Sequence, residues 1–411
     1  MNKGEIIVGL DIGTTKICAV VGEVMPSGQI EILGMGTHPS EGLRKGVVVN
    51  IDTTVASIKK AVQEAELMAG CEISNVITGI AGGHIKGFNS QGVFAVKGRE
   101  VTSQDKNRAV EAAKAVAIPT DREVIHTLVQ EFILDGQEGI QDPLGMSGVR
   151  LEVKVHMVTG AVAAAHNLIK CCNQAGLDVV DIVLQSLASA EAVLTVEERN
   201  LGSALLDFGG GTVDMAVFSQ ESIKHTGCLP LGGNNLTTDL AVGLRTPRSA
   251  AEQIKLHYGA CMVSMVGKDE SLLVEGITGH ESMRIKRQIV ASIIEPRVEE
   301  ILTLLQMELN QSGYMDQVVN GLVLTGGSCL LEGLPEMCEQ IFAMPTRRGY
   351  PMGVGGLIDI VHNPMYATAV GLVLYGARNR GGENDKKFRI RDGHVYNRVL
   401  QRMRRFFSDV F

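Results

Sequence analysis

The sequence has no run of about 18 apolar residues, the length that a membrane-spanning helix needs. Because Asp11 interrupts the first apolar stretch, no secretory signal is expected either. There are eight cysteines but no CxxC pair, which favours reduced thiols in a cytoplasmic protein without a zinc site. No GxxxxGK[ST] motif is present, and no GxGxxG follows the first apolar segment, so neither a P-loop nor a dinucleotide fold is expected.

The charge of the chain is unevenly spread. The 411 residues carry a net charge of -8, but residues 378–411 carry +6, so the remaining body carries -14. An acidic body argues against a broad nucleic-acid surface, and no nucleic-acid partner is expected. The short basic end instead predicts contact with something anionic. At about 100–200 residues per domain, the length predicts two to four lobes.

Two distant segments of the chain share one pattern. In EIIVGLDIGTTKICAVVGEV an apolar strand ends near Asp11, a Gly-Thr-Thr turn follows, and a second strand begins at Ile17. In SALLDFGGGTVDMAVF a buried strand ends at Asp207, followed by a glycine-rich turn and another strand. Both segments predict β-hairpins, and the repetition predicts two similar domains that face each other.

Such turns can bind phosphate, because glycines let backbone N–H groups converge on one point. A carboxylate beside a phosphate requires a cation between them, and Mg²⁺ held through water by Asp11 and Asp207 is the expected solution. A single turn of this kind is more often only a hairpin, but two at this separation, each with its aspartate, favour a function. The residues expected at the phosphates are Asp11, Gly13, Thr14, Thr15, Lys16, Asp207, Gly209, Gly210, Gly211 and Thr212.

A third glycine element, NGLVLTGGSCLLEGL, places Gly326, Gly327 and Ser328 after an apolar strand, with a helix expected to start near Ser328. Its plain interpretation is a strand-to-helix turn. Its functional interpretation is close approach of the backbone to a base or ribose.

These elements together resemble a known superfamily. DIGTTK, DFGGGTVD and GLVLTGGS resemble the two phosphate loops and the adenosine loop of the actin, Hsp70 and sugar-kinase superfamily, and LQSLASAEAVL and YATAVGLVLYGA resemble its two interdomain helices. QEFILDGQEGIQDPLGMSGVRLEVKVHMVTG, the Glu-Pro-Arg at 295–297 and the amphipathic end resemble the FtsA family of bacterial cell-division actin homologues. The resemblance implies an α/β, two-lobed actin-like fold with duplicated ribonuclease-H-like domains, an inserted 1C subdomain, a C-terminal amphipathic helix, and ATP with Mg²⁺ between the lobes.

The resemblance also implies a division of the chain. Its parts are subdomain 1A at 1–83 and 161–198, the inserted 1C at 84–160, subdomain 2A at 199–231 and 303–360, subdomain 2B at 232–302, a return helix at 361–377, a flexible linker at 378–394 and a membrane-targeting helix at 395–411. The insert's own sequence predicts a helix over 104–117 and strands near 124–129 and 150–158.

Further residues are assigned to the nucleotide by the resemblance. Glu252 and Lys255 share one helix face, where spacing alone favours an exposed ion pair and the resemblance favours contact with ribose or base. Gly232, Gly233 and Asn234 match a loop beneath the nucleotide, although alone they form only a turn.

ATP hydrolysis requires a residue that orients the attacking water. By resemblance this is Gln185, at the start of the first interdomain helix, and tight ATP–Mg²⁺ binding with at most slow turnover is expected.

The C-terminal segment has apolar residues at i, i+3, i+4 and i+7 spacing and arginines on its other face. Its charge prevents it from spanning a bilayer, but it could lie in the interface of an anionic membrane. The alternative is that it packs on the protein's own core. The residues expected at the membrane are Arg398, Val399, Leu400, Arg402, Met403, Arg405, Phe406 and Phe407.

The resemblance implies partners as well. It predicts tethering of FtsZ filaments to the cytoplasmic face of the inner membrane at the division site, polymerisation through 1C, and recruitment of later division proteins. The acidic C-terminal peptide of FtsZ would dock on residues 232–302, with Arg297 and Arg287 as candidate contacts. Arg297 could instead pair with Glu299 or Glu300. A soluble actin-fold phosphotransferase and a pilus-assembly actin homologue remain as alternatives.

Overall fold

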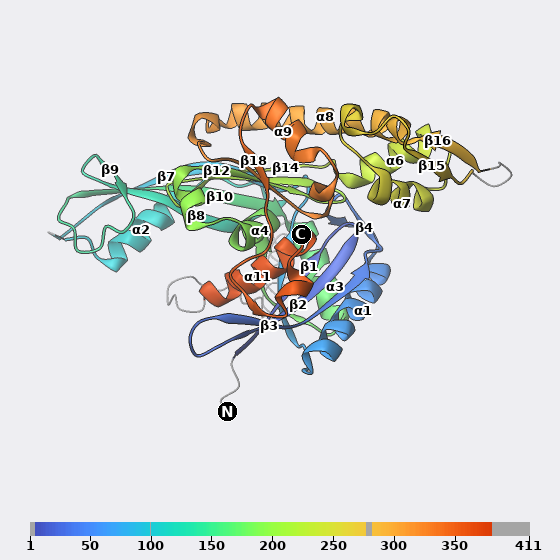
Figure 1. Cartoon of the computed structure of the whole chain (residues 1–411). Helices are drawn as coiled ribbons and strands as arrows, with labels where there is room; N and C mark the ends of the chain where they lie inside the picture. The colour runs from blue at the N-terminus through green and yellow to red at the C-terminus, as the bar shows by residue number, and fades with distance from the viewer. Residues whose placement is uncertain (1–4, 99, 277–281, 380–411) are drawn as a thin grey trace, which may run out of the picture.

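The computed structural model describes residues 5–98, 100–276 and 282–379 (Figure 1). The expected linker beyond residue 379, the expected membrane helix and all of its membrane residues therefore lie outside the described residues. Within the described ranges, no helix has both the length and the apolar character needed to cross a bilayer.

A six-stranded sheet forms the centre of the first lobe. Its hairpin pairs a strand ending just after Asp11 with a strand starting at Lys16, and a parallel strand lies beside the first of these. In spatial order the strands are β11 (Asp178–Leu184), β6 (Asn75–Ile80), β1 (Glu5–Ile12), β2 (Lys16–Val24), β3 (Ile30–Pro39) and β19 (Gly355–Gly356). A two-residue hairpin of β4 (Leu43–Arg44) and β5 (Val47–Val48) follows β3.

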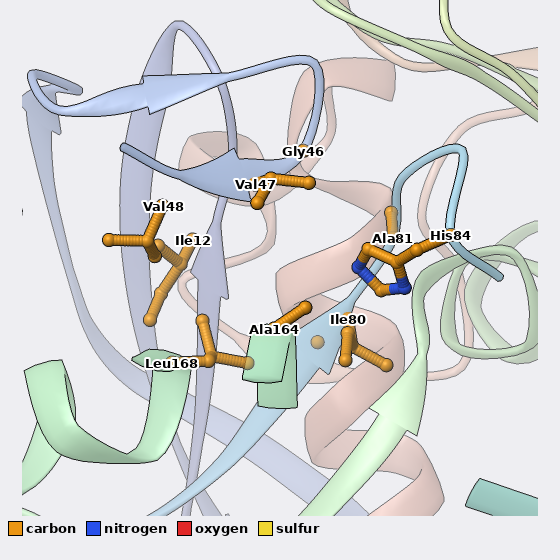
Figure 2. A pocket seen from close by; sticks show the side chains of 10 residues that line it. Ile12, Gly46, Val47, Val48, Ile80, Ala81, His84, Ala164 and Leu168 are labelled. Atoms are coloured by element: carbon orange, nitrogen blue, oxygen red, sulfur yellow. The ribbon is translucent and has the colours of Figure 1, made fainter. Parts of the chain in front are cut away.

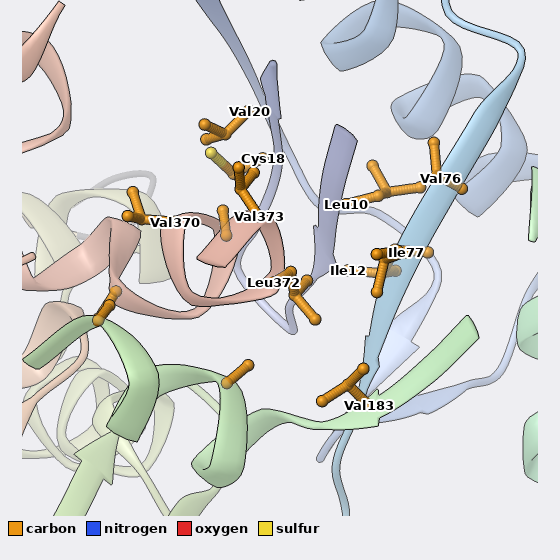
Figure 3. Packing of buried hydrophobic residues seen from close by; sticks show 14 of the residues in the cluster. Leu10, Ile12, Cys18, Val20, Val76, Ile77, Val183, Val370, Leu372 and Val373 are labelled. Atoms are coloured by element: carbon orange, nitrogen blue, oxygen red, sulfur yellow. The ribbon is translucent and has the colours of Figure 1, made fainter. Parts of the chain in front are cut away.

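Helices cover both faces of this sheet. Gly34 and Gly36 of β3 abut α1 (Ile51–Ala69), which contacts α3 (Val162–Gln174). Gly22 of β2 instead abuts α11 (Ala367–Arg378). Because Val21 pairs with Gly34 and successive residues of a strand point to opposite faces, α11 lies on the face opposite α1. Figure 3 shows the α11 side chains Val370, Leu372 and Val373 among apolar residues of β1 and β2.

The inserted segment forms its own four-stranded sheet and its own core, to one side of both lobes (Figure 1). The strands, in spatial order, are β7 (Lys86–Ala95), β10 (Arg150–Ala161), β8 (Arg122–Leu134) and β9 (Gln137–Ile140), with α2 (Ser103–Lys114) packed against β7 and β10. A capping box fixes the start of α2, because Thr102 accepts from the backbone of Asp105 and the Asp105 carboxylate accepts from the backbone of Thr102.

The second lobe repeats the arrangement of the first. The hairpin β12–β13 has a parallel partner, β17, beside its first strand, as β6 lies beside β1. The sheet order is β14 (Ser222–Leu229), β13 (Val213–Ser219), β12 (Ser203–Phe208), β17 (Gly321–Thr325) and β18 (Thr346–Arg348). Outside it lie α6 (Gly233–Gly243), α7 (Arg248–Tyr258), α8 (Arg287–Ser312), α9 (Leu334–Phe342) and the hairpin of β15 (Ser271–Val274) with β16 (Met283–Lys286).

Several boundaries expected from the resemblance fall inside helices or strands, and the segment expected at 303–360 contributes strands to both sheets. The one at residues 302 and 303 lies inside α8, whose buried residues continue from Val298 to Leu309. β19, in the segment expected to belong to the second lobe, pairs with β3 of the first sheet. The remaining short elements are α5 (Val196–Leu201), α10 (Ile358–Val361) and the 3-10 turns η1 (Val263–Met265), η2 (Met315–Gln317), η3 (Gly327–Leu330) and η4 (Pro364–Tyr366).

Two helices join the lobes, α4 (Gln185–Val193) and α11. α4 contacts β6 and β11 of the first sheet and β12 and β13 of the second. The two helices cross very closely, because a Cβ added at Gly371 would lie 1.8 Å from the backbone oxygen of Ala188. Only glycine allows this approach.

Two buried histidines attach the inserted sheet to the lobes. The backbone N–H of Leu184 donates to His126 Nε2 at 3.0 Å, joining β8 to the first lobe. His156 Nε2 lies 2.8 Å from the Thr226 hydroxyl of β14 in the second lobe, and its Nδ1 lies 2.7 Å from Asn89 Oδ1. Burial lowers the pKa of each imidazole to about 4, so both are neutral in the folded protein at pH 7.

Acidification is therefore expected to destabilise the protein through these groups. An unfolded imidazole binds a proton below pH 6.5, whereas folded His126 does so only below about 4. The stability that neutral His126 contributes is complete above pH 6.5 and is lost between 6.5 and 4, with a cost of about 2 kcal/mol at pH 5. His126→Gln keeps an acceptor for Leu184 and does not titrate. In urea unfolding at pH 7, 6 and 5, the free energy of unfolding of His126→Gln should fall less than that of the wild type, by about that amount at pH 5. Equal falls in the two proteins would contradict the conclusion that His126 is buried as a neutral group.

Candidate nucleotide site

The two hairpins that were expected to bind phosphate have the same local geometry. In the first turn the backbone N–H of Gly13 donates to the carbonyl of Lys16 at 3.0 Å. In the second turn Gly209 donates to the carbonyl of Thr212 at the same distance. Asp11 and Asp207 each precede the last residue of their strand, so each carboxylate stands beside its turn. The repeat seen in the sequence is therefore a repeat of one backbone arrangement.

The two turns meet between the lobes. A Cβ on Gly210 would lie 2.3 Å from Thr15 Cγ2, and one on Gly211 would lie 2.4 Å from Thr14 Oγ1. Thr14 also accepts a hydrogen bond from the backbone N–H of Gly46 at 3.0 Å, which joins the β4–β5 hairpin to the first turn. The glycines of the second turn are thus required by the closeness of the first.

Asp11 and Asp207 are buried, with exposed fractions of 7% and 8%. Burial raises the pKa of Asp11 to about 6; Lys16 opposes this shift and the negative charge of Asp207 adds to it. Burial likewise raises the pKa of Asp207, against hydrogen bonds from Ser189 and Thr368. Two buried carboxylates that repel each other beside glycine turns suit a Mg²⁺ ion held with phosphates. Within the described residues, no cluster of three or more His, Cys, Asp or Glu side chains is arranged to hold a metal ion.

Lys16 contacts residues near the start of α11 as well as Asp11. Its Nζ donates to the carbonyl of Met365 at 2.8 Å, lies 4.7 Å from the centre of the Tyr366 ring, and is 3.9 Å from Asp11 Oδ2. Its positive charge opposes the rise in the pKa of both Asp11 and Asp207.

Gln185 is the first residue of α4 and lies beside Asp11. Its Nε2 donates to Asp11 Oδ1 at 3.1 Å. The side chain lies over Gly79 at the end of β6, where a Cβ would be 2.8 Å from Gln185 Cγ. An amide in this position could orient a water molecule next to a metal-bound phosphate.

The remaining sequence-predicted loops join the second turn. Gly233 and Asn234 donate backbone hydrogen bonds to the carbonyls of Gly209 and Gly210, at 3.0 and 2.7 Å. Ser328 Oγ also donates to Gly209 O, at 3.1 Å. Gly326 has a φ of +81°, and a Cβ there would lie 2.4 Å from Asp207 Oδ1. The three glycine elements of the second lobe are therefore one connected unit.

Lys255 and Glu252 form the ion pair that their spacing suggested, at 2.8 Å, and the lysine is buried. Lys255 Nζ also donates to Gly233 O at 3.2 Å and to Thr237 Oγ1 at 3.0 Å. The pair thus ties α7 to the start of α6, beside the second turn.

Sequence reasoning missed three polar residues here. Asp214 ends the motif DFGGGTVD, and burial raises its pKa to about 7. Thr212 donates to its Oδ2 at 2.8 Å, while its Oδ1 has no partner among the described residues. The motif's second aspartate was the available signal. Ser189 and Thr368, which bind Asp207, lie within apolar helices and give no signal in the sequence.

A small cavity lies behind the first turn. Its volume of about 10 Å³ holds roughly one water molecule, so it is not a nucleotide pocket. Figure 2 shows the ring of His84 among its lining residues, with Ile12, Val47, Val48 and Ile80.

Arg297 and Arg287, the two candidate contacts for a partner peptide, have different surroundings. Arg297 of α8 binds Asp239 of α6 through Nε at 2.6 Å and Nη2 at 3.2 Å, and it also pairs with Glu300. Arg287 binds Glu270 at 2.8 Å, Glu332 and the carbonyl of Tyr258, and it is the more buried of the two. Arg287 therefore ties three segments together, whereas Arg297 stands at the surface between two helices.

Comparison with known proteins places these features in a family context. A family model described as cell division protein FtsA matches residues 204–371, and one described as the SHS2 domain inserted in FTSA matches residues 82–159. The cell division protein FtsA of Pseudomonas aeruginosa is 50% identical over 380 residues, covering 92% of this chain and 91% of that protein.

Solved structures show the same fold at low identity. The PilM-PilN type IV pilus biogenesis complex matches with a TM-score of 0.66 at 18% identity, covering 90% of this chain and 98% of that one. MreB5 of Spiroplasma citri bound to ADP matches with a TM-score of 0.55 at 14% identity, covering 91% and 99%. The two-lobed α/β architecture is thus that of the actin-like proteins.

Proposed function

Because the chain belongs to the FtsA family of cell-division proteins, we propose that it is an ATP- and Mg²⁺-binding, actin-like adaptor that tethers FtsZ filaments to the inner membrane. The observation that carries the nucleotide part is the meeting of two glycine turns beside Asp11 and Asp207 at the junction of the lobes. An actin-fold neighbour solved with ADP supports it.

In this proposal each group has a definite task. The turns around Gly13 and Gly210 offer backbone N–H groups to the phosphates, and Asp11 and Asp207 hold Mg²⁺ through water. When bound, Mg²⁺ would neutralise the charge of the terminal phosphate oxygens. The unit formed by residues 232–234, 252–255 and 326–328 lies beside the second turn and would hold the ribose and base. Equilibrium titration with a fluorescent ATP analogue tests this directly. The proposal would be refuted if the analogue showed no binding that depends on Mg²⁺.

Gln185→Ala is expected to lower the rate of ATP hydrolysis about 100-fold while changing ATP affinity little, because the amide would orient water and not bind the nucleotide. Single-turnover hydrolysis and equilibrium binding should be measured on the same preparation. Unchanged turnover would exclude Gln185 as the water-orienting residue. A large loss of affinity would mean that its hydrogen bond to Asp11 serves the metal site instead.

The membrane part rests on the sequence of residues 395–411. An apolar stripe with Phe406 and Phe407 can enter the interface, while Arg398, Arg402 and Arg405 meet anionic headgroups. We expect the full chain to float with anionic liposomes and a chain ending at residue 394 to stay in solution. If the full chain stayed in solution like the shortened chain, the result would favour a C-terminal segment that packs on the protein itself, as in a soluble phosphotransferase.

FtsZ is proposed to bind between α6 and α8. The same two helices carry exposed apolar side chains, Val242 of α6 at 74% and Ile289 of α8 at 44%. A surface that offers a cation and exposed apolar side chains suits a peptide that carries both acidic and apolar side chains. The peptide carboxylate would replace Asp239 on the guanidinium, with bidentate geometry.

Arg297→Glu is expected to weaken FtsZ peptide binding at least about 100-fold, because it replaces the cation by a repelling charge. Folding should change little, since the ion pairs of Arg297 lie at the surface. Arg287→Glu tests the second candidate contact, and the three partners of Arg287 predict that this variant is also less stable. Unaltered peptide affinity in Arg297→Glu, measured by calorimetry, would remove this site.

Self-assembly through the inserted sheet and recruitment of later division proteins complete the proposal, and both rest on family membership. The likeness to PilM, at 18% identity, concerns the fold and does not favour pilus assembly.

A further inference from the structure

Asp207 is held by hydroxyl groups from the two helices that cross between the lobes. Ser189 of α4 donates to Asp207 Oδ2 at 2.5 Å. Thr368 of α11 lies 2.9 Å from Ser189 Oγ and donates to the same carboxylate oxygen at 3.2 Å. Each hydroxyl group has one proton to donate. The Ser189 hydroxyl donates to Asp207, so the Thr368 hydroxyl is the donor toward both Ser189 Oγ and Asp207. The three buried side chains form one network that ends on the carboxylate.

The network leaves the other carboxylate oxygen in a fixed place. Oδ1 lies against Gly326, where a Cβ would be 2.4 Å away. The rotamer of Asp207 is therefore determined from one side by α4 and α11 and from the other by the third glycine turn. A carboxylate held in this way needs no rearrangement to meet a hydrated cation.

The hydroxyls also lie where the helices approach most closely. Ser189 follows Ala188, whose backbone oxygen would be 1.8 Å from a Cβ on Gly371, and Thr368 lies one turn before Gly371 on α11. A change in the crossing of the helices must therefore move the two hydroxyls relative to Asp207.

We propose that Ser189 and Thr368 are positioning residues that hold Asp207 for the Mg²⁺ of the bound nucleotide and link that ion to the crossing of α4 and α11. This inference rests on the proposed function, because it assumes that Asp207 serves a nucleotide-bound cation.

The test is the Mg²⁺ concentration that half-saturates binding of a fluorescent ATP analogue. Ser189→Ala and Thr368→Val should each raise it about tenfold or more, because each removes a hydrogen bond to a charged group. Thr368→Ser keeps the hydroxyl and should restore the wild-type value. Ser186→Ala is the matched control, since Ser186 lies buried on the same helix and its hydroxyl has no partner among the described residues. Thermal unfolding should accompany every variant.

The outcomes separate the two proposals. If the wild type shows no Mg²⁺-dependent nucleotide binding, the proposed function fails and this inference fails with it. If the wild type binds, but Ser189→Ala and Thr368→Val have the same Mg²⁺ dependence as Ser186→Ala, only the positioning role is overturned. Should Ser189→Ala fail to fold, the contrast between Thr368→Val and Thr368→Ser still decides, and equal values for that pair would overturn the inference.

Discussion

Gly211→Ala is expected to lower the affinity for ATP–Mg²⁺ by at least about 100-fold. The added Cβ would lie 2.4 Å from Thr14 Oγ1 and 2.8 Å from Thr14 Cβ, so rotation of the threonine side chain cannot remove the overlap. The second turn must therefore move away from the first, and a displacement of about 1 Å in a positioned site is enough for a loss of this size. Titration with a fluorescent ATP analogue measures it.

Gly98→Ala is the matched control, because a Cβ there meets only ordinary contacts, the nearest being Glu100 O at 3.8 Å. Its nucleotide affinity should equal that of the wild type. Affinity within threefold of the wild type in Gly211→Ala itself would contradict the account, since the two turns would then not form a single phosphate site.

Gly371→Ala is expected to destabilise the protein by about 3 kcal/mol, which is the opposite of the usual effect in a helix. Replacing a helical glycine by alanine ordinarily stabilises by about 1 kcal/mol. Here the new Cβ would overlap the backbone oxygen of Ala188 at 1.8 Å, and neither helix can avoid this by changing a rotamer. The helices must separate, and the core that α11 forms with β1 and β2 must loosen with them.

Urea unfolding at pH 7 tests this through the midpoint and the slope. A lower midpoint with an unchanged slope indicates lost stability without a change in the unfolding transition. Stabilisation of any size would show that the helices can separate at no cost, and the close crossing would then not determine how the lobes are joined.

The parts of the fold that the sequence predicted well depend on local signals. Both hairpins, with Asp11 and Asp207 at the ends of their first strands, follow from apolar strands bounded by glycine turns. The actin-like α/β fold with its inserted subdomain was implied by the resemblance of these motifs to a known family, and it is confirmed. These features are recognisable because each is contained in a short stretch of chain.

Other elements differ from expectation because their patterns are weak. The helix expected over 104–117 ends at Lys114, and the strand expected near 124–129 extends over Arg122–Leu134. β7, KGFNSQGVFA, was not anticipated, since its two glycines and mixed polar residues hide the alternation of a strand. The helix expected near Ser328 is only the short turn η3, and α9 begins at Leu334.

The arrangement of the site depended on contacts that no local pattern contains. Ser189 and Thr368 are 179 positions apart in the chain, yet they meet on one carboxylate. Lys16 Nζ likewise binds the carbonyl of Met365, 349 positions away. Such contacts are created by packing of the two lobes, and they appear only when the fold is assembled.

The central claim is that this chain connects FtsZ to a membrane, and co-flotation tests it most directly. FtsZ filaments, anionic liposomes and ATP–Mg²⁺ should be mixed with the full chain, with a chain ending at residue 394, and with Arg297→Glu. The account predicts that FtsZ floats only with the full wild-type chain, that the shortened chain leaves both proteins in solution, and that Arg297→Glu floats alone. Flotation of FtsZ with the shortened chain, or its absence with the full chain, would contradict the account.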